Sequence, residues 1–184
     1  MSTSNRGKIV DLGTEELIFE VDAPLAWLTF NRPEARNAMT WAMYDGLVRA
    51  CEWVDKNDDI KAFLLKGAGD KAFIAGTDIS QFTQFESPQD AIDYEARMNN
   101  IIGRLEAVKK PTIALIRGYA VGGGAAIAMA CDLRICAPDA KFGIPIARTL
   151  GNCLSMANYA RLVDLVGPSR AKYMIFTAEM VDAE

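Results

Sequence analysis

The same succession of predicted elements occurs twice along the chain: a short apolar strand, a glycine-bearing loop and then a helix. The first copy starts with a strand at residues 60–66 and continues to a helix that Ser87 and the following proline open. The second starts with a strand at residues 112–116, followed by the turn at residues 117–124 and a helix of small residues. We therefore expect stacked strand-loop-helix turns in a single α/β domain spanning residues 1–184, and a sizeable core is feasible because 51% of the residues are apolar.

The segments on either side of these turns add a hairpin and three helices. Apolar runs at residues 16–21 and 25–30, separated by Asp-Ala-Pro, predict two paired strands. Thr40 is well placed to cap a helix whose apolar residues recur at spacings of four, four and three. Near the end of the chain, residues 154–166 and 168–177 are expected to be helical, because a glycine stops the first and a proline starts the second.

Charge and hydropathy exclude several classes of partner. The formal net charge of -4 gives no basic excess of the kind that nucleic acid or an anionic membrane surface would require. Residues 1–7 are polar and lack an apolar signal core, and the longest apolar stretch, residues 120–131, is short and broken by three glycines. We expect a cytoplasmic protein with neither a nucleic-acid nor a membrane partner.

The chain has four cysteines and no histidine. Cys51, Cys131, Cys136 and Cys153 show no CxxC spacing, so we expect no metal site. The first three lie among apolar neighbours and are expected to be buried, reduced thiols. Without histidine, a mechanism in which imidazole is the base is excluded for this chain.

The glycine turn at residues 118–124 is the strongest candidate for a binding site. Three successive glycines leave backbone N–H groups bare of side chains at the start of a helix, where positive potential favours an oxygen that gains negative charge. Flexibility or tight packing of the turn is the alternative interpretation. The spacing fits neither GxGxxG nor a phosphate loop, because Gly124-Ala125 stands where Lys-Ser/Thr is required. A second loop, residues 73–79, could aim the N–H of Thr77 at the same oxygen.

Five motifs in order resemble those of the crotonase superfamily, the enoyl-CoA hydratase/isomerase family. They are Asn31-Arg32-Pro33-Glu34-Ala35-Arg36-Asn37-Ala38, Ala75-Gly76-Thr77-Asp78-Ile79, the turn from Gly118 to Gly124, Cys131-Asp132-Leu133-Arg134 and Phe142-Gly143-Ile144-Pro145. The resemblance covers nearly the whole chain from about Glu16. It implies an α/β, crotonase-like fold of repeated ββα turns, with a helical C-terminal part that is truncated here.

The resemblance also implies a function and a set of site residues. A protein of this kind binds an acyl-CoA or enoyl-CoA thioester as substrate, has no permanently bound cofactor, and assembles as a homotrimer or hexamer. Its oxyanion hole would be the backbone N–H groups of Thr77 and Gly123, which would stabilise an enolate-like thioester oxygen. The implied coenzyme A contacts are Ala35, Arg36, Ala38, Ala75, Asp78 and Ile79. Arg36 or Lys71 would meet a phosphate or remain a solvated surface charge.

The sequence departs from the family pattern at the two positions where hydratases carry catalytic glutamates. These positions are Ala126 and Ile146, and neither side chain transfers a proton. Candidates for a replacement acid or nucleophile are Asp78, Arg148, Cys153 and Ser155, although Asp78 is also placed to cap a helix beginning near Ile79. An enzyme of the hydratase/isomerase type is the leading hypothesis. The alternatives are a crotonase with another acyl-CoA reaction, a non-catalytic acyl-CoA binder or assembly subunit, and a purely structural α/β domain.

Overall fold

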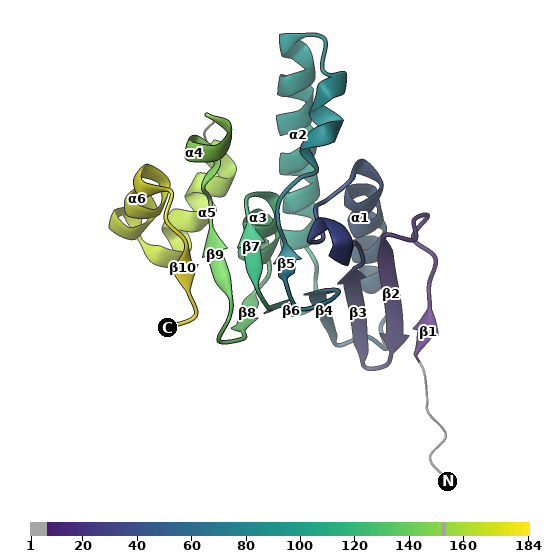
Figure 1. Ribbon diagram of the computed structural model, residues 1–184. Coiled ribbons are helices and arrows are strands. Elements are labelled where there is room, and N and C mark those ends of the chain that lie inside the picture. Colours follow the sequence, from purple (N-terminus) through teal and green to yellow (C-terminus); the bar gives the residue numbers. More distant parts are fainter. Residues whose placement is uncertain (1–6, 152–153) are drawn as a thin grey trace.

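The computed structural model describes residues 7–151 and 154–184, which form two sheets and the helices that flank them (Figure 1). The larger sheet has six strands in the spatial order β1-β2-β3-β4-β6-β8. These strands are β1 (Lys8–Ile9), β2 (Leu17–Asp22), β3 (Leu25–Phe30), β4 (Ala62–Gly67), β6 (Thr112–Ile116) and β8 (Leu133–Cys136). The smaller sheet has the order β10-β9-β7-β5. Its strands are β5 (Ala72–Ile74), β7 (Tyr119–Val121), β9 (Lys141–Gly143) and β10 (Val181–Asp182).

The pairing of these strands explains the repeated pattern in the sequence. In the larger sheet β3, β4, β6 and β8 run parallel to one another, and in the smaller sheet β5, β7 and β9 do the same. After the first hairpin, each successive pair of strands, β4 with β5, β6 with β7 and β8 with β9, therefore gives one strand to each sheet before the chain enters a helix. The expected fold of repeated ββα turns is confirmed, as is the antiparallel hairpin of β2 and β3.

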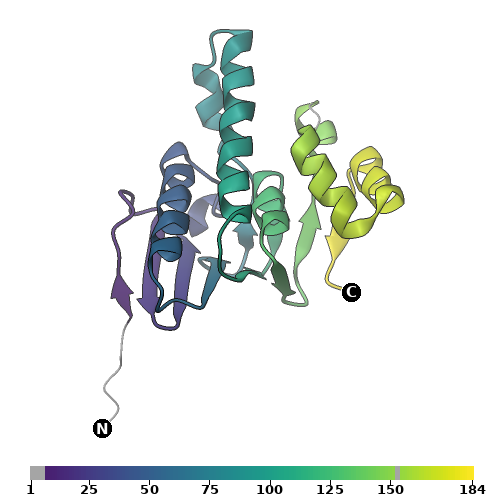
Figure 2. The same ribbon diagram turned by 180° about the vertical axis from the view of Figure 1, so that it is seen from behind.

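The helices that flank the sheets begin, in two cases, where the sequence places a cap. They are α1 (Trp41–Lys56), α2 (Pro88–Glu106), α3 (Gly123–Ala130), α4 (Ile146–Leu150), α5 (Met156–Val166) and α6 (Pro168–Thr177), with short 3₁₀ turns η1 (Pro33–Ala35) and η2 (Ile79–Gln84). Thr40 accepts a hydrogen bond from the N–H of Met43 at 3.2 Å, and Ser87 with Asp90 forms a capping box. Seen from behind, α1, α2 and α3 lie on the same side of the larger sheet, and the N-terminal end of α2 projects beyond it (Figure 2).

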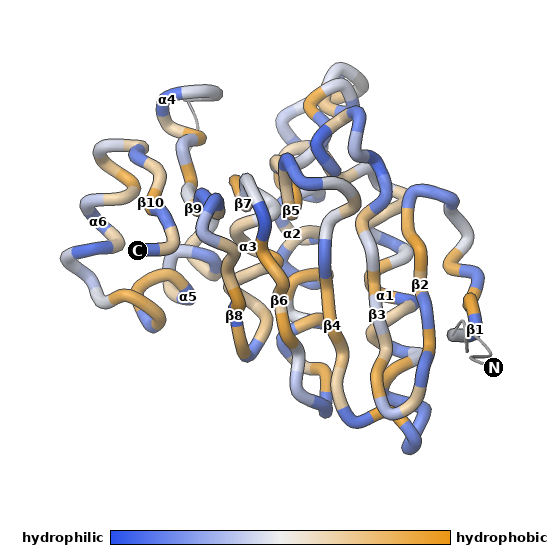
Figure 3. The backbone as a smooth tube through the Cα atoms, turned by 60° about the horizontal axis from the view of Figure 1, so that its bottom comes forward, coloured by the Kyte–Doolittle hydropathy of each residue, from blue (hydrophilic) through white to orange (hydrophobic). Residues whose placement is uncertain are grey.

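The core lies between this sheet and the helices. The predicted apolar stripe of α1, from Met43 to Val54, is buried, and α3 is buried along almost its whole length. Apolar residues also dominate β4 and β6 (Figure 3). No helix in the described part of the chain is both long enough and apolar enough to cross a membrane.

Two expectations from the sequence need correction. Cys136 is exposed rather than buried, because β8 is an edge strand of the larger sheet and its neighbours Leu133 and Ile135 are also exposed. The segments expected to be loops at residues 73–79 and 118–124 contain parts of β5 and β7. Strands of three residues are too short to show the alternating pattern that marks a strand in sequence.

Candidate active site

Two loops that are far apart in the sequence are joined by backbone hydrogen bonds. The N–H of Ala75 donates to the carbonyl of Arg36 at 3.1 Å, and the N–H of Met39 donates to the carbonyl of Gly76 at 2.9 Å. A third bond runs from the N–H of Asp78 to the carbonyl of Met39 at 2.9 Å. The structure thus brings together the two groups of residues that the resemblance assigns to coenzyme A.

Charged side chains tie the same loops together. Arg32 forms ion pairs of 3.1 Å with both Glu16 and Asp78, and it also donates to the carbonyl of Ala38 at 2.7 Å. Asp78 accepts hydrogen bonds from the hydroxyl and the N–H of Ser80, at 2.7 and 3.1 Å. The Ser80 hydroxyl, together with Arg32, lowers the pKa of Asp78. Asp78 is therefore the cap of η2, as expected, and its carboxylate is already engaged.

The glycine turn at residues 118–124 lies next to the loop that carries Thr77. Gly122 has a φ of 55° and a ψ of -115°, a conformation that side chains disfavour, and it leads into α3. A Cβ atom on the next residue, Gly123, would lie 2.7 Å from the Tyr44 hydroxyl and 3.6 Å from the Thr77 nitrogen. The backbones of Thr77 and Gly123 are therefore neighbours. Neither N–H donates to an acceptor among residues 7–151 and 154–184.

A cavity of about 900 Å³ opens beside these two N–H groups. Its wall combines the loop at residues 75–79 and the glycine turn with one face of α2 and with the segment around α4 and the start of α5. The lining residues are Tyr44, Ala75, Gly76, Thr77, Ile79, Phe82, Phe85, Ala91, Tyr94, Glu95, Met98, Ile102, Val121, Gly122, Gly123, Ala126, Pro145, Ile146, Thr149, Gly151, Leu154, Ser155 and Asn158. Most of them are apolar, as is usual for a site that holds a small organic ligand.

Three hydroxyl groups meet at the edge of the glycine turn. The Thr77 Oγ1 lies 2.8 Å from the Tyr44 hydroxyl and 3.4 Å from the Tyr94 hydroxyl. Burial raises the pKa of both tyrosines, so each stays neutral over the physiological range. Rings of Trp41, Phe82 and Tyr94 pack edge-on or tilted against one another and make this wall of the cavity aromatic.

The other residues proposed from the sequence are placed as follows. Thr77, Gly123, Ala75 and Ile79 line the cavity, whereas Ala35, Arg36, Ala38 and Asp78 do not. Arg36 and Lys71 are exposed.

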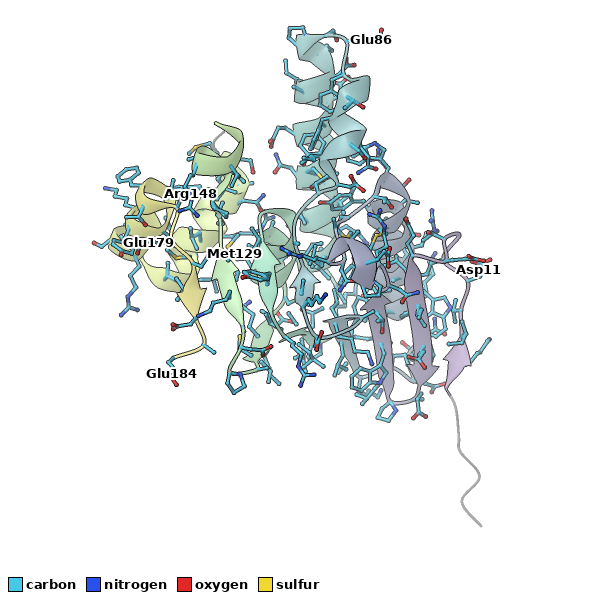
Figure 4. All side chains as sticks on the ribbon, in the orientation of Figure 1. Asp11, Glu86, Met129, Arg148, Glu179 and Glu184 are labelled. Carbon is cyan, nitrogen blue, oxygen red and sulfur yellow. The ribbon has the colours of Figure 1, made fainter. Side chains whose placement is uncertain are left out.

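Of the candidate acids and nucleophiles, Arg148 is exposed and lies on the side of α4 away from α2 (Figure 4). Ser155 lines the cavity, but its hydroxyl caps α5 and lies 3.3 Å from Asn99 Oδ1. Cys153 lies outside the described residues.

Ala126 and Ile146 both line the cavity, where their alkyl side chains carry no proton. The sequence reasoning missed Tyr44, Tyr94 and Glu95, which also line it. A signal for Glu95 exists in the sequence, because it precedes Met98 by three residues on the stripe of α2 that faces the core.

Comparisons with known proteins identify a family. The model of the family described as enoyl-CoA hydratase/isomerase matches residues 20–184. A crotonyl-CoA hydratase from Syntrophomonas wolfei is 38% identical over 92% of this chain and 65% of its own length. A short-chain-enoyl-CoA hydratase from Clostridium acetobutylicum is 36% identical over 91% of this chain and 64% of its own length.

Solved structures show the same likeness. The crystal structure of an enoyl-CoA hydratase/carnithine racemase from Magnetospirillum magneticum superposes with a TM-score of 0.88 and 31% identity, covering 93% of this chain and 64% of that one. The chain thus spans less than two thirds of the length of these relatives.

Proposed function

The chain belongs to the enoyl-CoA hydratase/isomerase family, and on that premise we propose that it is an enzyme that binds an acyl-CoA thioester and stabilises its enolate in an oxyanion hole. The observation that supports this most is the pair of neighbouring N–H groups beside the cavity, on Thr77 and Gly123, which donate to no acceptor among the described residues. Gly123 is also the first residue of α3, so the partial positive charge of the helix N-terminus adds to the two donors.

The chemistry of a thioester suits these donors. When a proton leaves or joins the carbon next to the thioester carbonyl, negative charge develops on the carbonyl oxygen. Fixed N–H donors in a site that excludes water stabilise that charge by about 3 kcal/mol each. The apolar cavity would hold the acyl chain. The joined loops would hold coenzyme A, through Ala35, Arg36 and Ala38 on one side and Ala75, Asp78 and Ile79 on the other.

The names of the relatives suggest the substrate class. Two of them are a crotonyl-CoA hydratase and a short-chain-enoyl-CoA hydratase. We assign a short trans-2-enoyl-CoA as substrate, with coenzyme A entering as part of the substrate rather than as a bound cofactor. We also assign a homotrimeric or hexameric assembly, a cytoplasmic location and a role in fatty acid metabolism.

The test is turnover of crotonyl-CoA, followed by the loss of absorbance of its conjugated double bond. Gly123→Val is expected to reduce turnover at least about 100-fold, because the side chain fills the place of the thioester oxygen. Gly103→Val is the matched control, since a Cβ at Gly103 meets no atom within 4 Å. Equal turnover by the two variants would overturn the assignment of the oxyanion hole.

One observation favours a second candidate, a non-catalytic acyl-CoA binder or assembly subunit. Ala126 and Ile146 occupy the positions at which the family resemblance leads one to expect glutamates. Calorimetry with crotonyl-CoA separates the two candidates. Binding without turnover of crotonyl-CoA, and without proton exchange on a saturated acyl-CoA, identifies the binder.

A further inference from the structure

The cavity contains one carboxylate among the described residues that line it, and it belongs to Glu95 on α2. The other titratable groups in the described lining are the hydroxyls of Tyr44 and Tyr94, whose pKa values burial raises. The facing wall contributes Ile146, Thr149, Leu154, Ser155 and Asn158, which carry no charge. Among the described residues that line the cavity, Glu95 therefore supplies the only carboxylate.

The Glu95 carboxylate is also available. Two other half-buried acids are engaged: Asp78 with Arg32 and Ser80, and Asp55 with Arg104. Within residues 7–151 and 154–184, Glu95 makes neither an ion pair nor a side-chain hydrogen bond. Within these residues its carboxylate is therefore open to accept a proton from a ligand in the cavity.

The position of Glu95 relates it to the proposed oxyanion hole. Its neighbour in the chain, Tyr94, reaches the Thr77 side chain at 3.4 Å, so this part of α2 passes the loop that carries the Thr77 N–H. Glu95, Met98 and Ile102 continue along the same face of α2, and all three line the cavity. An acyl chain in the cavity would therefore lie between the glycine turn and the face of α2 that carries this carboxylate.

Partial burial makes the Glu95 carboxylate more basic. Removal from solvent raises its pKa above the ordinary value of 4.5. A carboxylate with a raised pKa is a stronger base than an exposed one.

We propose that Glu95 is the residue that removes and returns the proton on C2 of the bound acyl-CoA. The C2–H bond breaks and its proton goes to the Glu95 carboxylate. The electron pair of that bond forms the C1=C2 double bond, and the π electrons of the thioester carbonyl move to the oxygen held by Thr77 and Gly123. The reverse step returns a proton to C2, so no other reactant is consumed. This inference rests on the proposed function.

The test uses butanoyl-CoA in deuterium oxide, because a saturated thioester shows proton abstraction without hydration. The wild-type protein is expected to exchange the C2 protons for deuterium, as followed by NMR. Glu95→Gln should slow the exchange at least about 100-fold while the calorimetric affinity for butanoyl-CoA changes less than about threefold. Glu52→Gln, on the exposed side of α1, is the matched control and should exchange at the wild-type rate.

A second variant covers the case in which Glu95→Gln does not fold. Glu95→Asp keeps the carboxylate and should exchange more slowly than wild type, with the acid limb of its pH-rate profile displaced. Exchange by either Glu95 variant at the wild-type rate with an unchanged pH profile would overturn the role of Glu95 while leaving the oxyanion hole standing. Absence of exchange and of crotonyl-CoA turnover in the wild-type protein would overturn both proposals.

Discussion

At the scale of single residues, the loops of the site depend on Asn37, whose side chain is fully buried. Its Nδ2 donates to the carbonyls of Ala68 and Ala72 at 3.0 and 2.8 Å, and its Oδ1 accepts from the N–H of Arg32 at 3.0 Å. Its φ of 57° is one that asparagine tolerates better than most residues. Asn37 therefore holds the first loop against the strand that leads to Thr77.

We predict that Asn37→Ala lowers the free energy of unfolding by about 2–4 kcal/mol, because three hydrogen bonds are lost and buried carbonyls are left unpaired. Urea denaturation followed by circular dichroism measures this. Asn31→Ala on the same loop is the control, since its single bond to the Glu15 carbonyl is at the surface, and it should cost less than about 1 kcal/mol. Similar losses in the two variants would show that Asn37 has no special role.

Residues that act locally could be predicted from the sequence, whereas residues that act across the fold could not. The caps at Thr40 and Asp78 follow from the few residues around them, and both are confirmed. The burial of Asn37 and the hydroxyl contact between Tyr44 and Thr77 join segments more than 30 residues apart. A contact between residues so far apart in sequence leaves no local sequence pattern from which it could be predicted.

At the scale of elements, α1 and α2 are linked by two ion pairs that differ in burial. Asp55 accepts hydrogen bonds from Arg104 at 2.6 Å and from the N–H of Lys109 at 2.8 Å, and its side chain is 14% exposed. Asp45 pairs with Arg97 at 2.6 Å, but their side chains are 49% and 41% exposed. Burial alone would raise the pKa of Asp55, but the hydrogen bonds from Lys109 and Arg104 outweigh it and lower the pKa.

We predict that Asp55→Asn lowers the free energy of unfolding by about 1–3 kcal/mol at pH 7, and that Asp45→Asn lowers it by less than about 0.5 kcal/mol. The Asp55 contribution is fully present above its ordinary pKa of 3.8 and disappears as pH falls through the lower pKa of the folded state. The deficit of Asp55→Asn should therefore shrink when urea denaturation is repeated near pH 3. A deficit that is the same at both pH values would contradict an electrostatic link between the helices.

Elements with strong periodicity were predictable, and the smaller sheet was not. The sequence indicated α1, α2, α5, α6 and the hairpin, because their apolar patterns extend over several turns or a full strand. In contrast, β5, β7 and β9 have three residues each, and pairing with one another, rather than intrinsic preference, stabilises them. The family resemblance implied repeated ββα turns, but the division of their strands between two sheets is seen only in the structure.

At the scale of the whole molecule, the crotonase fold buries several groups that release their protons at a higher pH in the folded chain than in the unfolded one. Burial raises the pKa of the Cys51 and Cys131 thiols from 9.0 to about 12, and it raises the pKa of Tyr44 from 10.0. The unfolded chain therefore releases these protons at a lower pH than the folded chain does. The stability that the neutral groups provide is fully present below about pH 9 and is lost as the pH rises towards 12.

We predict that the free energy of unfolding falls above pH 9, with a slope that grows by about 1.4 kcal/mol per pH unit for each group ionised only in the unfolded chain. Urea denaturation under reducing conditions, from pH 8 to pH 10.5, measures that slope. Cys51→Ala should make it shallower by about 1 kcal/mol per pH unit, whatever the variant loses in stability at pH 8. Cys136→Ala, at an exposed thiol, should leave the slope unchanged. If Cys51→Ala and Cys136→Ala gave equal slopes, burial of the Cys51 thiol would not contribute to the alkaline instability, and the decline would have to come from other groups.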